Sequence, residues 1–334
     1  MGTETCPLWF RRFIDDDEVV DALFGAVEKW AREQGMEEIH GPMGFTDMDH
    51  EGMLIEGFDQ IGTMATIYNY PYYPKQVERI GYGKDQDWHE FKIYIPDGVP
   101  EKHLRIGEIV KKKYGLKVLK FKNAKEIMPY ARPVFHTLNA AFAPLYGFAQ
   151  LTEKQIDYYI NMYIPMLRYD LVTLIVREED NAVVGFGISL PNLSRALQKA
   201  RGHMLPFGWI HLLKALKSKP KVIDLYLTGV LPEYQSKGVN ALLFNDLIPV
   251  YKRIGAVYAE SNPELETNSA VQAQWDYFKR EHHKSRRAYI KKVIRDMDEL
   301  NSTIQHLRNI TMMTSRHWTG WSISAGVPVC ISEN

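Results

Sequence analysis

Cysteine is scarce in this chain: Cys6 and Cys330 are its only two cysteines, and they lie at opposite ends of 334 residues. A disulfide framework and a thiolate zinc site both need clustered cysteines, so the sequence supports neither. No run of about 18 apolar residues occurs, so we expect no membrane-spanning helix. Arg11 and Arg12 interrupt the first apolar residues. We therefore expect no signal peptide and a reducing, cytoplasmic setting.

Net charge is also absent, because 41 Lys and Arg side chains balance 41 Asp and Glu side chains. A neutral chain does not create the overall positive field that binds nucleic acid, so we expect no nucleic-acid partner. The hydrophobic content of 45% and the charged content of 25% are ordinary for a globular protein. At about 100–200 residues per domain, the length predicts two domains.

Helical and strand periodicities alternate along the chain, which predicts an α/β protein. The segment 41–73 has no steady period, and such long irregular segments are often functional. Pro249 is expected to kink or shorten its helix. A similar order of elements near 17–95 and near 239–290 suggests a duplication. The predicted helices are 17–34, 75–80, 101–114, 134–145, 152–167, 209–216, 239–253, 269–281 and 296–307, and the predicted strands are 38–40, 88–95, 116–121, 172–177, 182–190, 222–230 and 256–260.

The stretch from Tyr226 to Leu243 carries the clearest chemical signal. A strand runs into a short polar loop containing Gly238, and a helix begins at once. Backbone N–H groups and the partial positive charge of a helix N-terminus bind a pyrophosphate in such a place. Lys237 would add charge, and Gly238 would let the backbone approach closely. An ordinary strand–loop–helix corner is an equally good interpretation of the residues alone, since the Walker and dinucleotide spacings are absent.

The hexapeptide Gln235-Ser-Lys-Gly-Val-Asn240 resembles the acyl-CoA loop of the GNAT superfamily, usually written Gln/Arg-x-x-Gly-x-Gly/Ala. Asn240 departs from the sixth position, although Ala241 follows it, and Val230 and Pro232 also match. The element order from 116 to 289 is similar to that of a complete GNAT lobe. The resemblance implies a mixed central sheet flanked by helices, in two GNAT-like lobes. It divides the chain into an incomplete lobe at 1–115, a complete acyltransferase lobe at 116–292, and a tail at 293–334 without an assigned role.

By this resemblance, the co-substrate is acetyl-CoA or a longer acyl-CoA, and no metal is involved. Asn262 and Asn268 sit where family members often contact the CoA arm, but a turn former or a helix cap explains each equally well. The residues that the resemblance assigns to acyl-CoA are Leu227, Gly229, Val230, Gln235, Ser236, Lys237, Gly238, Val239, Asn240, Ala241, Asn262 and Asn268.

The segment Gly41 to Phe58 resembles one in two-lobed bacterial GNAT-like proteins, among them the group that contains bacterial ceramide-synthase-type N-acyltransferases. Its Asp49, His50 and Glu51, with Asp47 nearby, are candidates for accepting a proton from an ammonium group. A solvated polar loop is the alternative. No helical His-x-x-x-His spacing supports a metal site.

Our leading hypothesis is transfer of an acyl group from acyl-CoA to a small-molecule amine. We favour a hydrophobic amine because residues 41–73, rich in Met and aromatic residues, could line a cleft between the lobes. The alternative, nearly as good, is that these side chains simply fill the core between the lobes. A catalytically silent GNAT-fold binding protein and a tRNA-dependent aminoacyl transferase are the alternatives.

The basic run 279–292 could bind the CoA 3′-phosphate or, as a peripheral contact, an anionic membrane, and a solvated helix end is its simpler interpretation. By the resemblance, Trp275 occupies the position at which many GNAT proteins carry a tyrosine that protonates the leaving CoA thiolate. Tyr277 lies two residues further along the expected helix and should point away from that position. The sequence leaves the oligomeric state open.

Overall fold

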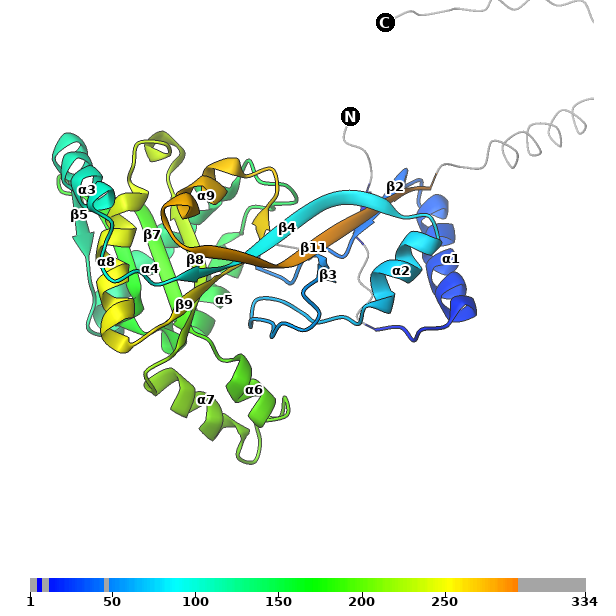
Figure 1. The fold of residues 1–334 in the computed structure, drawn as a ribbon. Coiled ribbons are helices and arrows are strands. Elements are labelled where there is room, and N and C mark those ends of the chain that lie inside the picture. The colour runs from blue at the N-terminus through cyan, green and yellow to red at the C-terminus, as the bar shows by residue number, and fades with distance from the viewer. Residues whose placement is uncertain (1–4, 8–11, 45–47, 294–334) are drawn as a thin grey trace, which may run out of the picture.

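The computed structural model describes residues 5–7, 12–44 and 48–293. In this part of the chain, eleven strands form one mixed sheet with helices on both faces (Figure 1), which confirms the predicted α/β class. The strands are β1 (Thr5–Pro7), β2 (Glu38–Gly41), β3 (Met53–Glu56), β4 (Gly83–Tyr94), β5 (Leu116–Leu119), β6 (Val172–Arg177), β7 (Val183–Pro191), β8 (Val222–Val230), β9 (Tyr258–Ser261), β10 (Glu264–Leu265) and β11 (Arg280–Lys292).

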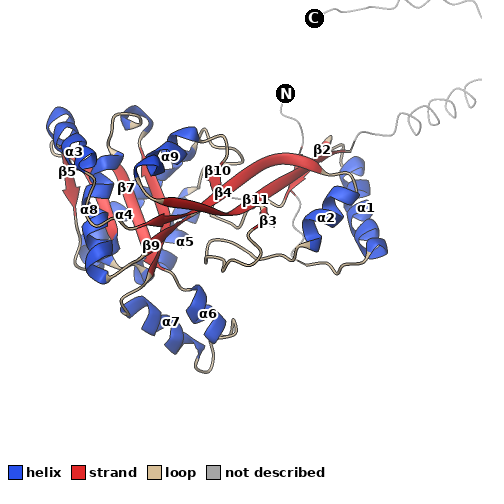
Figure 2. Ribbon diagram, in the orientation of Figure 1, coloured by secondary structure: helices blue, strands red, loops and turns tan. Residues whose placement is uncertain are grey.

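Nine α-helices are present in the same residues, and Figure 2 shows how they surround the strands. No helix in this part of the chain is long and apolar enough to cross a membrane. The expected helix at 296–307 and Asp47 lie outside the described residues. The helices are α1 (Asp17–Glu33), α2 (Tyr72–Arg79), α3 (Glu101–Tyr114), α4 (Ala124–Phe142), α5 (Glu153–Tyr163), α6 (Ser194–Lys199), α7 (Gly208–Lys217), α8 (Asn240–Ile254) and α9 (Ser269–Ala273).

The two halves of the chain repeat one order of elements and exchange their last strands. The series α1-β2-β3-α2-β4 recurs as α8-β9-β10-α9-β11. The long strand β4 pairs with β9 and β10 of the second series, whereas β11 pairs with β2 and β3 of the first. β4 and β11 pair with each other along almost their whole lengths. Neither series therefore completes its sheet without the other.

The division at residue 115 stays a prediction, because the sheet runs through both halves. The main strand order is β1-β2-β11-β4-β9-β8-β7-β6-β5, with β3 paired to β11 and β10 paired to β4 beside this path. Helix α3, which precedes the predicted boundary, packs on α8 with Val110 and Ile106 in one apolar cluster with Leu242.

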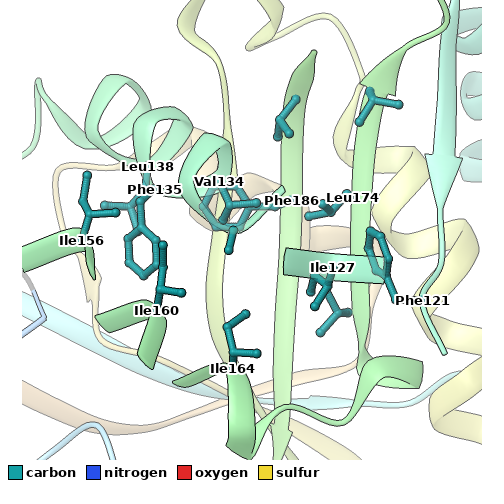
Figure 3. Close-up of a cluster of buried hydrophobic side chains, with 14 of the residues drawn as sticks. Phe121, Ile127, Val134, Phe135, Leu138, Ile156, Ile160, Ile164, Leu174 and Phe186 are labelled. Carbon is teal, nitrogen blue, oxygen red and sulfur yellow. The ribbon is translucent and has the colours of Figure 1, made fainter. Parts of the chain in front are cut away.

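Opposite faces of the C-terminal strands pack on different helices. In β7, Phe186 lies in the cluster formed by α4 and α5, and the next residue, Gly187, lies against Leu243 and Leu247 of α8. Successive strand residues point to opposite faces, so α4 and α8 cover the two faces of the sheet. Figure 3 shows side chains of α4 and α5 directed at β6 and β7. The core of this half thus consists of two apolar layers around a buried sheet.

Residues 280–292 correct two of our sequence-based expectations. The expected helix 269–281 ends at Ala273 and passes through a 3-10 turn, Gln274–Tyr277, into β11. The basic run 279–292 is therefore a central strand and not a helix end. Lys284 and Arg286 are fully buried in it.

Helix α8 also continues through Pro249 to Ile254, so the proline does not shorten it.

A buried network of charges explains how a basic segment forms a central strand. Lys284 Nζ lies 2.7 Å from Glu90 Oε2 and 2.6 Å from Glu260 Oε1, and Arg286 Nε lies 2.7 Å from Glu90 Oε1. Burial alone would raise the pKa of Glu90, but the charges of Arg286 and Lys284 hold it below its ordinary value. Glu90 is therefore ionised, and each cation needs its anion because an unpaired buried charge is very costly.

We predict that Arg286→Ala destabilises the protein by about 3–5 kcal/mol, because it leaves Glu90 with one cation fewer in a buried site. Arg280→Ala is the matched control on the same strand. Arg280 pairs with Asp276, but both side chains are partly exposed, so its loss should cost at most about 1 kcal/mol. Urea denaturation of the two variants measures the difference. Equal losses of unfolding free energy would contradict the importance of the buried network.

Candidate functional site

Strands β8 and β9 separate partway along β8. Their parallel ladder runs from Val222–Tyr258 to Leu225–Ser261 and ends there, whereas β8 continues to Val230 and stays paired with β7. The edge of β8 that faces β9 is thus left without a strand partner over 226–230. Backbone N–H and C=O groups need hydrogen-bond partners, so an open edge inside a sheet can receive an extended ligand.

Two cavities meet at this separation. The first, of about 230 Å³, is lined by residues of β8, the β9–α9 segment and the end of α4. The second, of about 50 Å³, lies against α8. Both are lined by Leu225, Thr228, Gln274 and Trp275, so they adjoin across the gap between the strands. The four shared residues place the two cavities on either side of the same gap between the strands.

The loop 231–239 leads into α8, the helix that lines one side of the second cavity. No side chain caps α8, whose first residue follows Val239. The first N–H groups of a helix lack the partners of a full turn, and here Ala241 N and Leu242 N donate instead to Gly238 O and Val239 O, at 3.0 Å each. Ser236 and Gly238 adopt positive φ angles of 59° and 79°. Exposed Lys237 places its Nζ 5.5 Å from the centroid of the Tyr234 ring.

Several residues of the predicted acyl-CoA set have structural roles that the sequence did not reveal. A Cβ added to Gly238 would lie 2.8 Å from Ile106 of α3, and one added to Gly229 would lie 2.7 Å from the ring of Phe186. Both glycines therefore allow close packing within the protein. Gln235 donates from Nε2 to Val230 O at 2.9 Å and thereby closes the loop.

Asn240 and Ala241 begin α8 next to the site. Asn240 Nδ2 donates to Gln274 Oε1 at 3.2 Å and so ties the helix start to a residue that lines both cavities. Ala241 is buried beneath the first turn. Leu227 lines the first cavity from β8.

Asn262 and Asn268 both line the first cavity, with different partners. Asn262 donates to the carbonyl of Tyr226, just beyond the end of the β8–β9 ladder, and its Oδ1 is buried without a hydrogen-bond partner among the described residues. That oxygen is available to accept from a ligand. Asn268 caps α9, since its Oδ1 accepts from Val271 N at 3.3 Å. The capping interpretation of Asn268 is thus correct, although the residue also faces the cavity.

Two of the three candidate proton acceptors in the segment 41–58 line the same cavity. Asp49 and Glu51 line it, opposite the residues of β8. His50 is not part of the lining, and its Nε2 lies 3.4 Å from Met64 O. The structure therefore brings Asp49 and Glu51, but not His50, to the gap between β8 and β9.

Glu264 is a cavity residue that the sequence analysis missed. Its Oε1 accepts from Trp275 Nε1 at 2.7 Å, and its Oε2 is buried without a hydrogen-bond partner among the described residues. Burial raises the pKa of this carboxyl to about 8, against the opposing effects of the Trp275 hydrogen bond and of Arg280. Nothing in the sequence around Glu264 marks it, because its environment comes from Trp275 and the separated strands.

Trp275 is buried at the gap, whereas Tyr277 is half exposed and accepts from Lys102 Nζ at 2.5 Å. Tyr277 lines neither cavity. No cluster of three or more His, Cys, Asp or Glu side chains suited to a metal ion occurs among the described residues.

The sequence of this chain is similar to those of known bacterial proteins. No protein-family profile matches the chain. It is 29% identical to Protein YghO of Escherichia coli (strain K12) over 286 residues, which cover 84% of this chain and 72% of that protein. It is also 29% identical to the bacterial ceramide synthase of Caulobacter vibrioides (strain NA1000 / CB15N) over 226 residues, or 66% of this chain and 57% of that protein. The predicted resemblance to the group containing bacterial ceramide-synthase-type proteins is thereby confirmed.

Among solved structures, a tandem GNAT protein from the clavulanic acid biosynthesis pathway matches with a TM-score of 0.43 and 13% sequence identity. The match covers 82% of this chain and 70% of that chain.

Proposed function

We propose that this chain, which resembles the two-lobed GNAT-type proteins, is an acyl-CoA-dependent N-acyltransferase. The observation that carries the proposal is the separation of β8 from β9 beside the uncapped start of α8, with a cavity on each side. The helix start and Lys237 suit a pyrophosphate. The open edge of β8 and Asn262 Oδ1 suit the amide groups of a pantetheine arm. A thioester would then reach the first cavity.

Catalysis would rest on placement and on proton transfer. The ammonium group loses two protons on the way to the amide, one before the nitrogen attacks the thioester carbon and one after the carbon–nitrogen bond has formed. The carbon–sulfur bond breaks and the departing thiolate gains one proton, so one proton is released overall. Asp49 or Glu51 would accept the first proton, directly or through water. Glu264 would protonate the thiolate and regain a proton from the nitrogen of the adduct, directly or through water, since its pKa of about 8 lies near the ordinary thiol value of about 8.5. Placement of the two reactants supplies much of the remaining acceleration.

We propose a hydrophobic amine as the acceptor. A third cavity, of about 50 Å³, lies beneath α4 and α5, and its lining is apolar apart from tyrosine hydroxyls. It shares Tyr226 and Leu227 with the first cavity. Tyr226 donates to the hydroxyl of Tyr163 at 3.0 Å, and this tyrosine pair stands between the two spaces. An alkyl group attached to the amine would extend from the carboxylates toward this apolar interior.

The first test blocks the gap between the strands. Thr228 is exposed and lines both cavities, so Thr228→Trp should fill the gap without disturbing the core. We expect calorimetric titration to show acyl-CoA affinity reduced by at least about tenfold, or about 1.4 kcal/mol. Glu179→Trp, in the exposed turn between β6 and β7, is the control and should bind normally. Undiminished binding by folded Thr228→Trp would rule out this path, and no binding by the unaltered protein would favour a silent GNAT-fold protein or an aminoacyl-tRNA donor.

The second test concerns Glu264. Glu264→Gln keeps an acceptor for Trp275 but removes the acid, so we expect the acyl-transfer rate to fall by about 10²-fold or more. In the unaltered enzyme the rate should decline above about pH 8, where this carboxyl loses its proton. The variant should lack that decline. Tyr277→Phe, outside both cavities, is the control and should keep its activity. A reversed result, with Tyr277→Phe inactive, would assign the acid to Tyr277.

The third test compares acceptors. Long-chain primary amines should be acylated at a kcat/KM at least about tenfold above that of small polar amines, because each methylene placed in an apolar site contributes about 0.8 kcal/mol. Rates of free CoA release for an amine series of increasing chain length provide the measurement. Faster acylation of small polar amines would refute the hydrophobic acceptor while leaving acyl transfer intact.

A further inference from the structure

The segment 193–223 concentrates positive charge in a protein whose net charge is zero. It contains no Asp or Glu, and it includes the whole of α6, α7 and their connection. Because the chain as a whole carries no net charge, this cluster of positive charges is a local feature of the surface and does not follow from the overall composition. Its seven basic residues are Arg195, Lys199, Arg201, Lys214, Lys217, Lys219 and Lys221.

The same segment exposes large apolar side chains. Leu205 is 80% exposed and Phe207 is 69% exposed, and both lie in the connection between the helices. Isolated exposed apolar residues are normal, but a contiguous group of them on a soluble surface marks an interaction site. The six members of the group fall within ten residues and are Met204, Leu205, Phe207, Trp209, Ile210 and Leu213.

The connection is folded in a way that holds these side chains outward. Trp209 N donates to Met204 O at 3.0 Å, and Trp209 Nε1 donates to Pro206 O at 3.0 Å. A Cβ on Gly208 would lie 1.7 Å from His203 O, so the turn packs against its own backbone. Figure 1 shows the α6–α7 pair projecting from the body, with the connection at its far end. Among the described residues, nothing covers these six apolar side chains, which are 43–80% exposed.

We propose that this α6–α7 hairpin, residues 193–217, docks on the surface of an anionic lipid bilayer. Apolar side chains with a tryptophan enter the headgroup–acyl boundary, and flanking Lys and Arg side chains contact anionic headgroups. A protein partner is disfavoured because lysine is depleted in the cores of protein interfaces. The contact would be peripheral and would place the chain beside a source of hydrophobic substrates. The inference rests on the surface alone and does not depend on the proposed acyl transfer.

Sedimentation of the full-length chain with lipid vesicles tests the docking. We expect binding to phosphatidylcholine vesicles that contain roughly 30% phosphatidylglycerol, and little binding to pure phosphatidylcholine. Raising the salt from about 0.05 M to about 0.5 M should weaken it, because the charges become screened. Leu205→Ser with Phe207→Ser, and separately Lys214→Gln with Lys217→Gln, should each lower the partition coefficient at least about tenfold.

Matched exposed residues elsewhere provide the controls. Leu104→Ser on α3, and Lys112→Gln with Lys154→Gln on α3 and α5, should bind vesicles like the unaltered protein. Thermal melting of every variant checks that it is folded, and the lysine variant tests the surface even if the apolar one fails to fold. Absence of binding to anionic vesicles, or unchanged binding by both hairpin variants, would overturn the proposal. A loss of self-association in the apolar variant, without vesicle binding by the unaltered chain, would instead assign the patch to a protein interface.

Discussion

The buried ion pairs between β4 and β11 are the interaction on which the rest of the structure depends. Glu90 comes from the first series of elements and Lys284 and Arg286 from the second, and all three are buried. Their pairing fixes the register of the two exchanged strands. Arg286 also donates to the carbonyl oxygen of Ile67 at 2.7 Å and to that of Gly52 at 3.5 Å. Gly52 directly follows the residues 49–51 that include two of the candidate proton acceptors. The network therefore joins the two halves and also holds the segment that supplies Asp49 and Glu51.

The two repeated series differ at the start of their first helices, and the difference decides which can bind a phosphate. Helix α1 is capped by Asp16, whose Oδ1 accepts from Val19 N at 3.1 Å, and its first turn contains Asp17 and Glu18. The Asp16 carboxylate thus occupies one of the N–H groups, and the three carboxylates together repel an anion. Helix α8 has neither a side-chain cap nor an acidic residue in its first turn. Only α8 thus keeps the electrostatic character that a pyrophosphate requires.

Structural features that depend on a local sequence pattern could be predicted from the sequence. Features that depend on contacts between distant residues could not. The strand–loop–helix unit from Val222 to Ile254 could be identified because its apolar periodicity and its glycine are local features. The strand at 280–292 could not be predicted, because the charges of Lys284 and Arg286 are typical of a solvent-exposed segment. They are buried only because Glu90, nearly two hundred residues away in the sequence, neutralises them. Glu264 escaped notice for the same reason. Its raised pKa arises from burial at the separation of two strands, and no neighbouring residue in the sequence signals it.

The strand exchange also explains why the candidate site needs both halves of the chain. Asp49 and Glu51 come from the irregular segment of the first series, whereas Glu264 and Trp275 come from the second. β10, which begins at Glu264, pairs with β4, so the same exchanged strand that carries Glu90 also positions the proposed acid. A separate C-terminal half would keep the open edge of β8 and the start of α8 but would lose the two carboxylates. In the proposed reaction, the second repeat would bind the acyl donor and the first would accept the ammonium proton, and the β4–β11 pairing joins the two repeats around one cavity.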